Sequence, residues 1–256
     1  MAGAVNHDLA LQLKGRDFLE LVDYTTEEIL YLIDLAIELK RKLKAGEVYQ
    51  PLKGKTLGMI FEKSSTRTRV SFEVGMYQLG GHALFLSRND LQLGRGETVW
   101  DTAQTMSRYL DGIMIRTYAH RNVIELARGA TVPVINGLTD LFHPCQALAD
   151  YQTILEHKGR LAGLKIAYVG DGNNMAHSLM IGASKLGLHF ASASPEGYEP
   201  DADVVRMSKE NAAQSGGSVS VLRDPKEAVD GADIVYTDVW ASMGFENEQE
   251  ERLRAF

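Results

Sequence analysis

Short apolar runs alternate along the chain with amphipathic stretches, and this alternation limits the possible folds more than any other feature of the sequence. In the first half, the apolar runs lie at residues 57–61, 83–86, 112–115 and 132–135. The stretches between and after them, at about 66–80, 98–110, 121–128 and 144–157, have the periodicity of helices. Strands that alternate with helices in this way form parallel sheets with helices on both faces.

A second series of the same kind follows. Its apolar runs lie at 164–169, 190–193, 219–222 and 234–238, again with helical patterns between them. The sequence therefore predicts an α/β protein of two domains, each a mainly parallel sheet flanked by helices, with residues 1–148 in the first and 149–256 in the second. Upstream of the first series, residues 14–43 predict a helix in which Thr25 and Glu28 form a capping box.

Composition excludes several classes of partner. The 256 residues carry 27 Lys and Arg against 34 Asp and Glu, so the net charge of −7 offers no attraction for nucleic acid. The single cysteine, Cys145, permits no internal disulfide and is typical of a reducing compartment. No apolar run is long enough to span a bilayer and the first residues lack a signal-peptide pattern, so we expect a cytoplasmic protein without membrane contact.

The segment 61–69, FEKSSTRTR, follows a predicted strand and opens a helix that Ser65 or Ser64 would cap. Arg67 and Arg69 lie in its first turn, where the helix dipole disfavours each cation by about 0.3–1 kcal/mol. A phosphate group bound at the helix start would account for these arginines. The hydroxyl, backbone N–H and guanidinium groups that would surround this phosphate belong to Ser65, Thr66, Arg67 and Thr68.

The alternative is an ordinary capped helix whose arginines lie in solvent or pair with carboxylates such as Glu62. The order of the residues themselves favours the phosphate site. Ser-Thr-Arg-Thr-Arg after a Phe-x-Lys strand end resembles the carbamoyl phosphate motif of the aspartate and ornithine carbamoyltransferase family. The resemblance extends from about Phe18 to the last residues. It implies a first domain that holds carbamoyl phosphate and a second that holds an amino-acid acceptor.

Two further segments match the carbamoyl phosphate side of the family. Arg116 ends a predicted strand, and His143-Pro144-Cys145-Gln146 precedes a helix with the proline at its first position. The resemblance implies that Arg116 contacts the carbonyl side of carbamoyl phosphate, His143 polarises the carbamoyl oxygen and Gln146 binds the NH2 group. It gives Pro144 and Cys145 a binding or packing role. Outside the family, the arginine would be an ordinary surface charge and the histidine a capped loop residue.

The loop at 87–97 is polar and contains glycines, so by itself it predicts only a mobile connector. The resemblance implies that Gln92 reaches the phosphate of a neighbouring subunit, and hence a homotrimer with shared active sites. The Gln-Leu-Gly sequence at this point favours the ornithine branch of the family over the aspartate branch.

The turn after the run at 164–169 contains Gly170 and Gly172, which is the beginning of a dinucleotide-binding pattern. Met175 stands where the third glycine would be, so an NAD-dependent dehydrogenase is a weaker interpretation than a tight strand-to-helix turn. In the ornithine branch, the resemblance implies that Asn174 binds the acceptor.

The last apolar run is followed by Asp238-Val-Trp-Ala-Ser-Met-Gly. Alone, this segment predicts a strand end and a turn with a buried Trp and Met. It closely resembles the ornithine-binding loop of the family, which implies that Asp238 and Ser242 contact the amino groups of the acceptor. The Met243 backbone would then contact the backbone end of the amino acid.

The resemblance thus implies transfer of the carbamoyl group from carbamoyl phosphate to the δ-amine of L-ornithine, giving L-citrulline and phosphate, with Arg116, His143 and Asp238 as catalytic residues. This chemistry needs neither a metal nor an organic cofactor. Another amine acceptor, such as putrescine or an acetylated ornithine, fits the Ser-Met-Gly loop less well.

The charged stretch at 246–256 predicts a helix still in progress, so we expect the chain to be incomplete. Family members continue into a His-Cys-Leu-Pro segment that contributes to the acceptor site. The alternative function is therefore a protein that binds carbamoyl phosphate without turnover.

Overall fold

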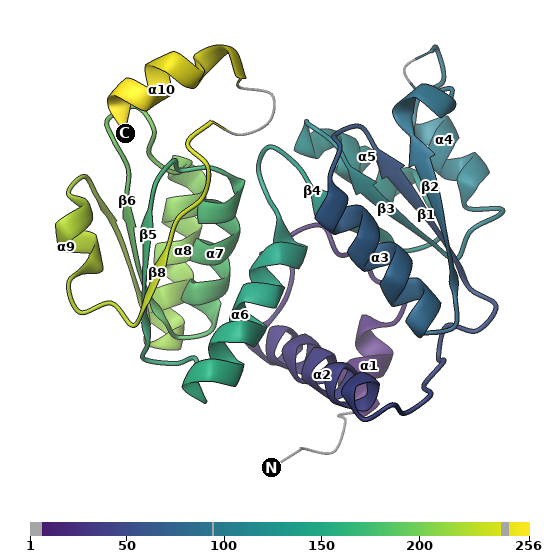
Figure 1. Ribbon diagram of the computed structural model, residues 1–256, viewed down its shortest axis with the longest axis horizontal. Helices are drawn as coiled ribbons and strands as arrows, with labels where there is room; N and C mark the ends of the chain where they lie inside the picture. The colour runs from purple at the N-terminus through teal and green to yellow at the C-terminus, as the bar shows by residue number, and fades with distance from the viewer. Residues whose placement is uncertain (1–6, 94, 242–245) are drawn as a thin grey trace. The chain divides into compact units, whose positions relative to one another are not determined.

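The computed structural model describes residues 7–93, 95–241 and 246–256 (Figure 1). The chain divides into two compact units. The first comprises Met1–Asp23 and Glu27–Cys145, and the second comprises Tyr24–Thr26 and Gln146–Phe256. Each unit contains a four-stranded sheet whose paired strands are all parallel, which confirms the predicted α/β class.

The first sheet has the strand order β2-β1-β3-β4. Its strands are β1 (Thr56–Phe61), β2 (His82–Ser87), β3 (Gly112–Arg116) and β4 (Val134–Leu138). The helices of this part of the chain are α1 (His7–Leu13), α2 (Thr26–Lys44), α3 (Thr66–Gln78), the short 3-10 helix η1 (Arg88–Asp90), α4 (Val99–Met106) and α5 (His120–Gly129). The predicted elements appear in the predicted order, and β1 to β3 lie within a residue or two of the predicted positions. The helix predicted over 14–43 begins only at Thr26, and α1 and η1 were not predicted.

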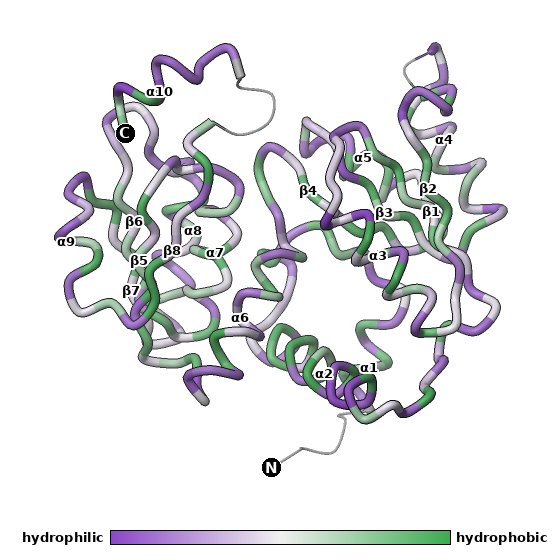
Figure 2. The backbone as a smooth tube through the Cα atoms, in the orientation of Figure 1, coloured by the Kyte–Doolittle hydropathy of each residue, from purple (hydrophilic) through white to green (hydrophobic). Residues whose placement is uncertain are grey.

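Alternate residues of the strands face opposite layers of helices. Met59 and Phe61 of β1 pack in a core cluster with Met76 of α3, whereas Ile60 packs in the cluster that contains Ala103 of α4 and Leu126 of α5. Both faces of the sheet are therefore buried, as the apolar runs predict. Figure 2 shows hydrophobic residues along β1 and β3 and hydrophilic ones on the surrounding loops and outer helix faces.

Strand β4 begins two residues later than the apolar run at 132–135 predicts and extends to Leu138. It continues through Asn136, which is fully buried and whose side-chain amide donates a hydrogen bond to the carbonyl of Leu19 at 2.8 Å. A distant segment thus supplies a partner for the side-chain nitrogen, while Oδ1 has no hydrogen-bond partner among the described residues. That partner cannot be inferred from the local hydrophobic pattern.

The second sheet has the order β7-β6-β5-β8. Its strands are β5 (Lys165–Val169), β6 (His189–Ala193), β7 (Ser218–Leu222) and β8 (Ile234–Tyr236). The remaining helices are α6 (Pro144–Lys158), α7 (Asn174–Lys185), α8 (Ala202–Ser215), α9 (Pro225–Val229), η2 (Glu246–Glu248) and α10 (Gln249–Ala255). The predicted C-terminal helix thus appears as η2 followed by α10. None of the described helices is long and apolar enough to cross a membrane.

Each sheet has a point at which the strand order reverses direction. In the first sheet the chain goes from β1 to β2 on one side and then to β3 and β4 on the other. In the second, β6 and β7 lie on one side of β5 and β8 lies on the other. Ligands of open α/β sheets bind at the carboxyl ends of the strands that flank such a point. The fold therefore places candidate sites after β1 and β3, and after β5 and β8.

Candidate active site

The start of α3 follows the carboxyl end of β1. Ser65 is the N-cap, as the sequence predicts, and its hydroxyl oxygen accepts the backbone N–H of Thr68 at 3.2 Å. Arg67 is exposed and has no carboxylate partner among the described residues. Arg69 binds Glu73 at 3.0 Å and lies 3.8 Å from the centre of the Phe85 ring. The alternative of a carboxylate-paired arginine therefore applies to Arg69, with Glu73 in place of Glu62.

Arg116 is the last residue of β3 and lies in register with Phe61 at the end of β1. It is only 5% exposed, and its Nη1 is 3.5 Å from the Thr68 hydroxyl. Its buried Nε has no hydrogen-bond partner among the described residues. Burial, followed by the charge of Arg67, lowers the pKa of Arg116 to about 10. A buried cation with an unused donor beside a second cation is an environment that an anion would stabilise.

His143 precedes α6 and lies within electrostatic reach of Arg116. Burial and the Arg116 charge lower the pKa of His143 to about 3, so the imidazole is neutral near pH 7. Pro144 is the first residue of α6, as predicted. The Cys145 thiol donates to the Asn136 carbonyl at 3.4 Å, and burial raises its pKa to about 12. Because the reactive form of cysteine is the thiolate, this environment argues against covalent catalysis by Cys145.

The two predicted glutamines lie in different surroundings. Gln146 is exposed, and its side-chain amide donates to Asp150 at 3.0 Å. Asp150 also accepts the Tyr236 hydroxyl at 3.1 Å, and burial raises its pKa. Gln92 is exposed in the loop after η1, and within the described ranges its side chain has no hydrogen bond to the Ser65–Thr68 segment.

Lys63, for which the sequence predicts no role, also lies at this edge of the sheet. Lys63 is 7% exposed, and its ammonium lies 4.3 Å from the centre of the Tyr118 ring. The backbone N–H groups of Glu62 and Lys63 both donate to the Arg116 carbonyl, at 2.9 and 3.4 Å. These contacts fix the chain after β1 against the end of β3. Its local signal is its place two residues after an apolar run, in the Phe-x-Lys strand end.

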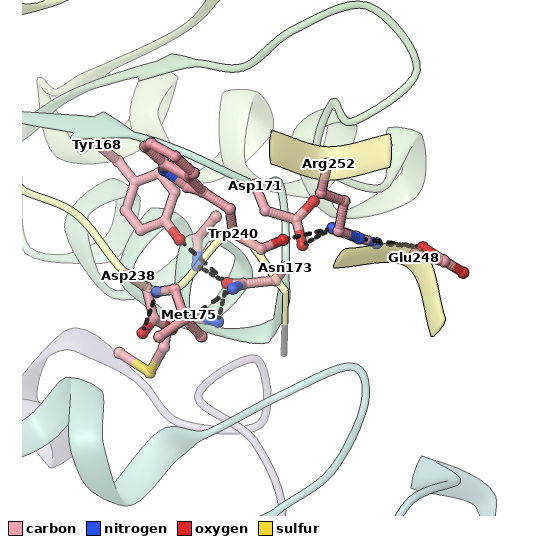
Figure 3. Close-up of polar contacts among 10 residues, drawn as sticks. Tyr168, Asp171, Asn173, Met175, Asp238, Trp240, Glu248 and Arg252 are labelled. Carbon is pink, nitrogen blue, oxygen red and sulfur yellow. Dashed lines mark hydrogen bonds and ion pairs between the residues drawn. The ribbon is translucent and has the colours of Figure 1, made fainter. Parts of the chain in front are cut away.

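In the second unit, Asp238 follows β8 and lies beside the N-terminus of α7 (Figure 3). The Asn173 amide donates to the Asp238 carboxylate at 3.4 Å, and the Tyr168 hydroxyl donates to the Asn173 oxygen at 3.1 Å. Asn173 also caps α7 by accepting the backbone N–H of Met175 at 2.9 Å. This group lies where the strand order of the second sheet reverses.

The remaining acceptor residues are placed as follows. Asn174 is the first residue of α7 and is 9% exposed. Ser242 and Met243 lie outside the described residues. The side chain that donates to the Asp238 carboxylate is that of Asn173, while binding of the acceptor by the neighbouring Asn174 stays a prediction. Helix-capping preference is the signal that could have identified Asn173.

Gly172, in the turn after β5, has a packing role. A Cβ atom at Gly172 would lie 2.2 Å from the backbone nitrogen of Pro200, and the Gly172 N–H donates to the Tyr198 carbonyl at 2.8 Å. The segment at 198–200 occupies the space beside this turn, which disfavours the dinucleotide interpretation. No group of three or more potential metal ligands occurs in the part of the chain that the structure describes.

Comparisons with known proteins agree with this architecture. Residues 16–156 match the aspartate/ornithine carbamoyltransferase carbamoyl-P binding domain, and residues 162–256 match the Asp/Orn binding domain of the same family. The chain is 64% identical to an ornithine carbamoyltransferase of Anoxybacillus flavithermus, over 98% of this chain and 80% of the relative. It is 59% identical to that of Thermococcus kodakarensis, over 97% of this chain and 79% of the relative.

Solved structures give the same result. The ornithine carbamoyltransferase of Pyrococcus furiosus superposes with a TM-score of 0.92 at 60% identity, covering 95% of this chain and 78% of that one. The anabolic enzyme of Campylobacter jejuni superposes with a TM-score of 0.88 at 43% identity, covering 94% and 78%. With both family domains matched in order and relatives of this identity aligned over nearly its whole length, the chain belongs to the aspartate/ornithine carbamoyltransferase family.

Proposed function

We propose that the chain transfers the carbamoyl group from carbamoyl phosphate to the δ-amine of L-ornithine, giving L-citrulline and phosphate. The observation that carries this proposal in the first unit is the buried Arg116, which lies beside the capped start of α3 and whose Nε has no partner in the part of the chain that the structure describes. The family membership and the names of the relatives select carbamoyl phosphate as the anion and ornithine as the acceptor.

Carbamoyl phosphate is proposed to bind with its phosphate on the first turn of α3, where unpaired N–H groups and the helix dipole favour an anion. Ser65, Thr66, Arg67 and Thr68 would hold the phosphate. Arg116, Thr68 and neutral His143 would donate hydrogen bonds to the carbamoyl oxygen. The side-chain oxygen of Gln146 would accept a hydrogen bond from the NH2 group of carbamoyl phosphate. Pro144 and Cys145 would pack beneath this end of the ligand. In this proposal residues 1–148 form the carbamoyl phosphate domain and residues 149–256 the ornithine domain.

Ornithine is proposed to bind after β5 and β8. Asp238 would hold its δ-amine, supported by the Asn173 amide 3.4 Å away. Asn174, Ser242 and the Met243 backbone would hold the amino-acid end. An alkyl amine of this kind has a pKa of about 10.4 in water, so it must lose a proton before it can act as a nucleophile.

In the reaction, the neutral δ-amine attacks the carbonyl carbon and the C–N bond forms. The negative charge that develops on the carbonyl oxygen is stabilised by Thr68, Arg116 and His143, and one such donor is typically worth about 2.7–4 kcal/mol. The C–O bond to phosphate then breaks, the attacking nitrogen gives its second proton to the departing phosphate, and the resulting hydrogen phosphate leaves from Ser65, Thr66 and Arg67. No step requires a metal or an organic cofactor.

We also propose a cytoplasmic homotrimer in which Gln92 of one subunit reaches the phosphate in the next. The exposed position of Gln92 and its lack of a hydrogen bond to the Ser65–Thr68 segment are consistent with a role toward another chain. The relative from Pyrococcus furiosus is named an anabolic ornithine carbamoyltransferase, which favours the synthetic direction in arginine metabolism.

The deciding experiment is citrulline formation from carbamoyl phosphate and ornithine, with putrescine and acetylated ornithine as competing acceptors. Citrulline formation that an Arg116→Met variant lacks supports the proposal. Carbamoyl phosphate binding without any product would favour the alternative of a binding protein. Turnover of another acceptor in preference to ornithine would contradict the assigned substrate.

A further inference from the structure

Arg252 of α10 binds both loops that carry the candidate ornithine site (Figure 3). Its Nη1 donates to the Asp171 carboxylate and to the Trp240 carbonyl, each at 2.8 Å. Asp171 is two residues before Asn173, and Trp240 is two residues after Asp238. One guanidinium nitrogen therefore binds a residue beside Asn173 and a residue beside Asp238, the two residues whose side chains are in contact in the site.

The surroundings of Arg252 hold it in one orientation. Its Nε and Nη2 both lie 3.0 Å from the Glu248 carboxylate, and the Tyr198 ring centre lies 4.9 Å from the guanidinium carbon. The residue is only 7% exposed. A planar guanidinium can serve a carboxylate on each side and a carbonyl at once, which the single ammonium of a lysine cannot do with the same geometry.

Aromatic contacts support the same arrangement. The Trp240 ring stacks on Phe256 with centroids 5.6 Å apart and an angle of 11°, and Phe256 also contacts Tyr198 at 5.1 Å. Trp240 is thus held through both its carbonyl and its ring. Burial raises the pKa of Asp171, and the charge of Arg252 acts in the opposite direction. The segment after Asp238 is therefore fastened to the loop after β5 through α10.

We propose that Arg252 is a positioning residue for the amino-acid acceptor. It fixes the spacing of Asn173 and Asp238 through Asp171 and Trp240, and does not itself contact the reacting atoms. This inference rests on the proposed function of the Asp238 site. A shift of about 1 Å in a reacting group can cost about 100-fold in rate. Loss of the Arg252 hydrogen bonds to Asp171 and Trp240 therefore strongly impairs the binding and reaction of ornithine.

The test compares Arg252→Met, Arg252→Lys and Asp171→Asn with the unchanged chain in steady-state kinetics for each substrate. The matched control is Arg206→Met, because Arg206 also pairs with two helical carboxylates, Asp203 and Glu210, but is 59% exposed. For Arg252→Met we expect the KM for ornithine to rise by about tenfold or more, while the KM for carbamoyl phosphate changes by less than about twofold. The KM of Arg252→Lys for ornithine should lie between those of the unchanged chain and Arg252→Met. Arg206→Met should change neither KM.

An equilibrium readout accompanies the kinetics. Trp100 and Trp240 are the two tryptophans, so Trp100→Phe leaves Trp240 as the sole source of tryptophan emission. In that background, Arg252→Met should shift the Trp240 emission and weaken the titration by ornithine in the presence of inorganic phosphate. Asp171→Asn should reproduce both effects, and the double variant should add little, because the two residues act through one contact.

The outcomes separate the two proposals. If the unchanged chain neither binds ornithine nor forms citrulline, the proposed function fails and this inference fails with it. If the unchanged chain is active but Arg252→Met and Asp171→Asn leave the KM for ornithine unchanged, only the role of Arg252 is overturned. Equal changes in both KM values, or a lower Tm alone, would identify Arg252 as a general structural residue.

Discussion

Arg116 combines a functional position with a cost to the folded state. It is 5% exposed, its Nε has no partner among the described residues, and burial lowers its pKa to about 10. Replacing a buried, incompletely paired charge by an apolar side chain of similar size is often neutral or stabilising, by roughly 1–4 kcal/mol. We therefore expect Arg116→Met to keep or raise the Tm of the ligand-free protein while abolishing carbamoyl phosphate binding, as measured by thermal unfolding and calorimetric titration.

The exposed Arg121 at the start of α5 provides the control, since Arg121→Met should alter neither the Tm nor the affinity. A large loss of Tm in Arg116→Met with unchanged affinity would show that this arginine stabilises the fold and has no ligand role.

His143 makes the stability of the first unit dependent on pH in a defined direction. Its pKa is lowered from 6.5 to about 3, so the unfolded chain takes up a proton between these values that the folded chain does not. The free energy of unfolding therefore falls as the pH drops through this window and is insensitive to His143 above it, with a slope of at most about 1.4 kcal/mol per pH unit. His143→Gln should show a shallower loss in urea unfolding between about pH 7 and about pH 5.

The pKa of His120 is also lowered by burial, so His120 and His143 act in the same direction. The difference between the unchanged chain and His143→Gln isolates one of them. Identical slopes for the two proteins would mean that His143 is protonated as readily in the folded state as in the unfolded one.

At the scale of elements, the start of α3 has two functions that substitutions at Ser65 can separate. The hydroxyl caps the helix by accepting the Thr68 N–H, so Ser65→Ala should cost about 1 kcal/mol of stability. Ser65→Asp restores a capping oxygen and favours the helix dipole, yet its negative charge repels a phosphate. We expect Ser65→Asp to recover the stability lost in Ser65→Ala, as measured by urea unfolding. We expect Ser65→Asp not to bind carbamoyl phosphate, as measured by titration.

Thr98 provides a matched comparison, because its hydroxyl caps α4 by accepting the Asp101 N–H at 3.0 Å. Thr98→Ala should lower stability by a similar amount without removing ligand binding. If Ser65→Asp bound carbamoyl phosphate as well as the unchanged chain, the phosphate would not lie on this helix start.

The elements also show what local sequence can predict. Apolar runs and caps identified the strands and the start of α3, because their periodicity and capping chemistry are local. Asn136 of β4 binds Leu19 across 117 positions of the chain, and Arg252 binds Asp171 across 81. Such pairs are created by the fold and leave no local pattern. The bond from the Asn173 amide to the Asp238 carboxylate likewise joins residues 65 positions apart.

At the scale of the whole molecule, the proposed trimer makes each active site depend on two chains. In a ring of identical subunits, Gln92 of one subunit and Arg116 of the next would serve the same ligand. We expect Gln92→Ala and Arg116→Met proteins to be weakly active alone and to regain activity when unfolded together, mixed equally and refolded. Random assembly leaves about a quarter of the sites with both residues intact, so recovery should approach a quarter of the activity of the unchanged protein.

The control for this mixture is Arg116→Met with His143→Gln. Both of these residues belong to the same unit of the same chain, so no exchange of subunits can produce an intact site and the mixture should remain inactive. Recovery in the first mixture and not in the second requires that Gln92 acts across a subunit boundary. Failure of both mixtures, with trimers present by light scattering, would place Gln92 in its own subunit's site or outside the site altogether.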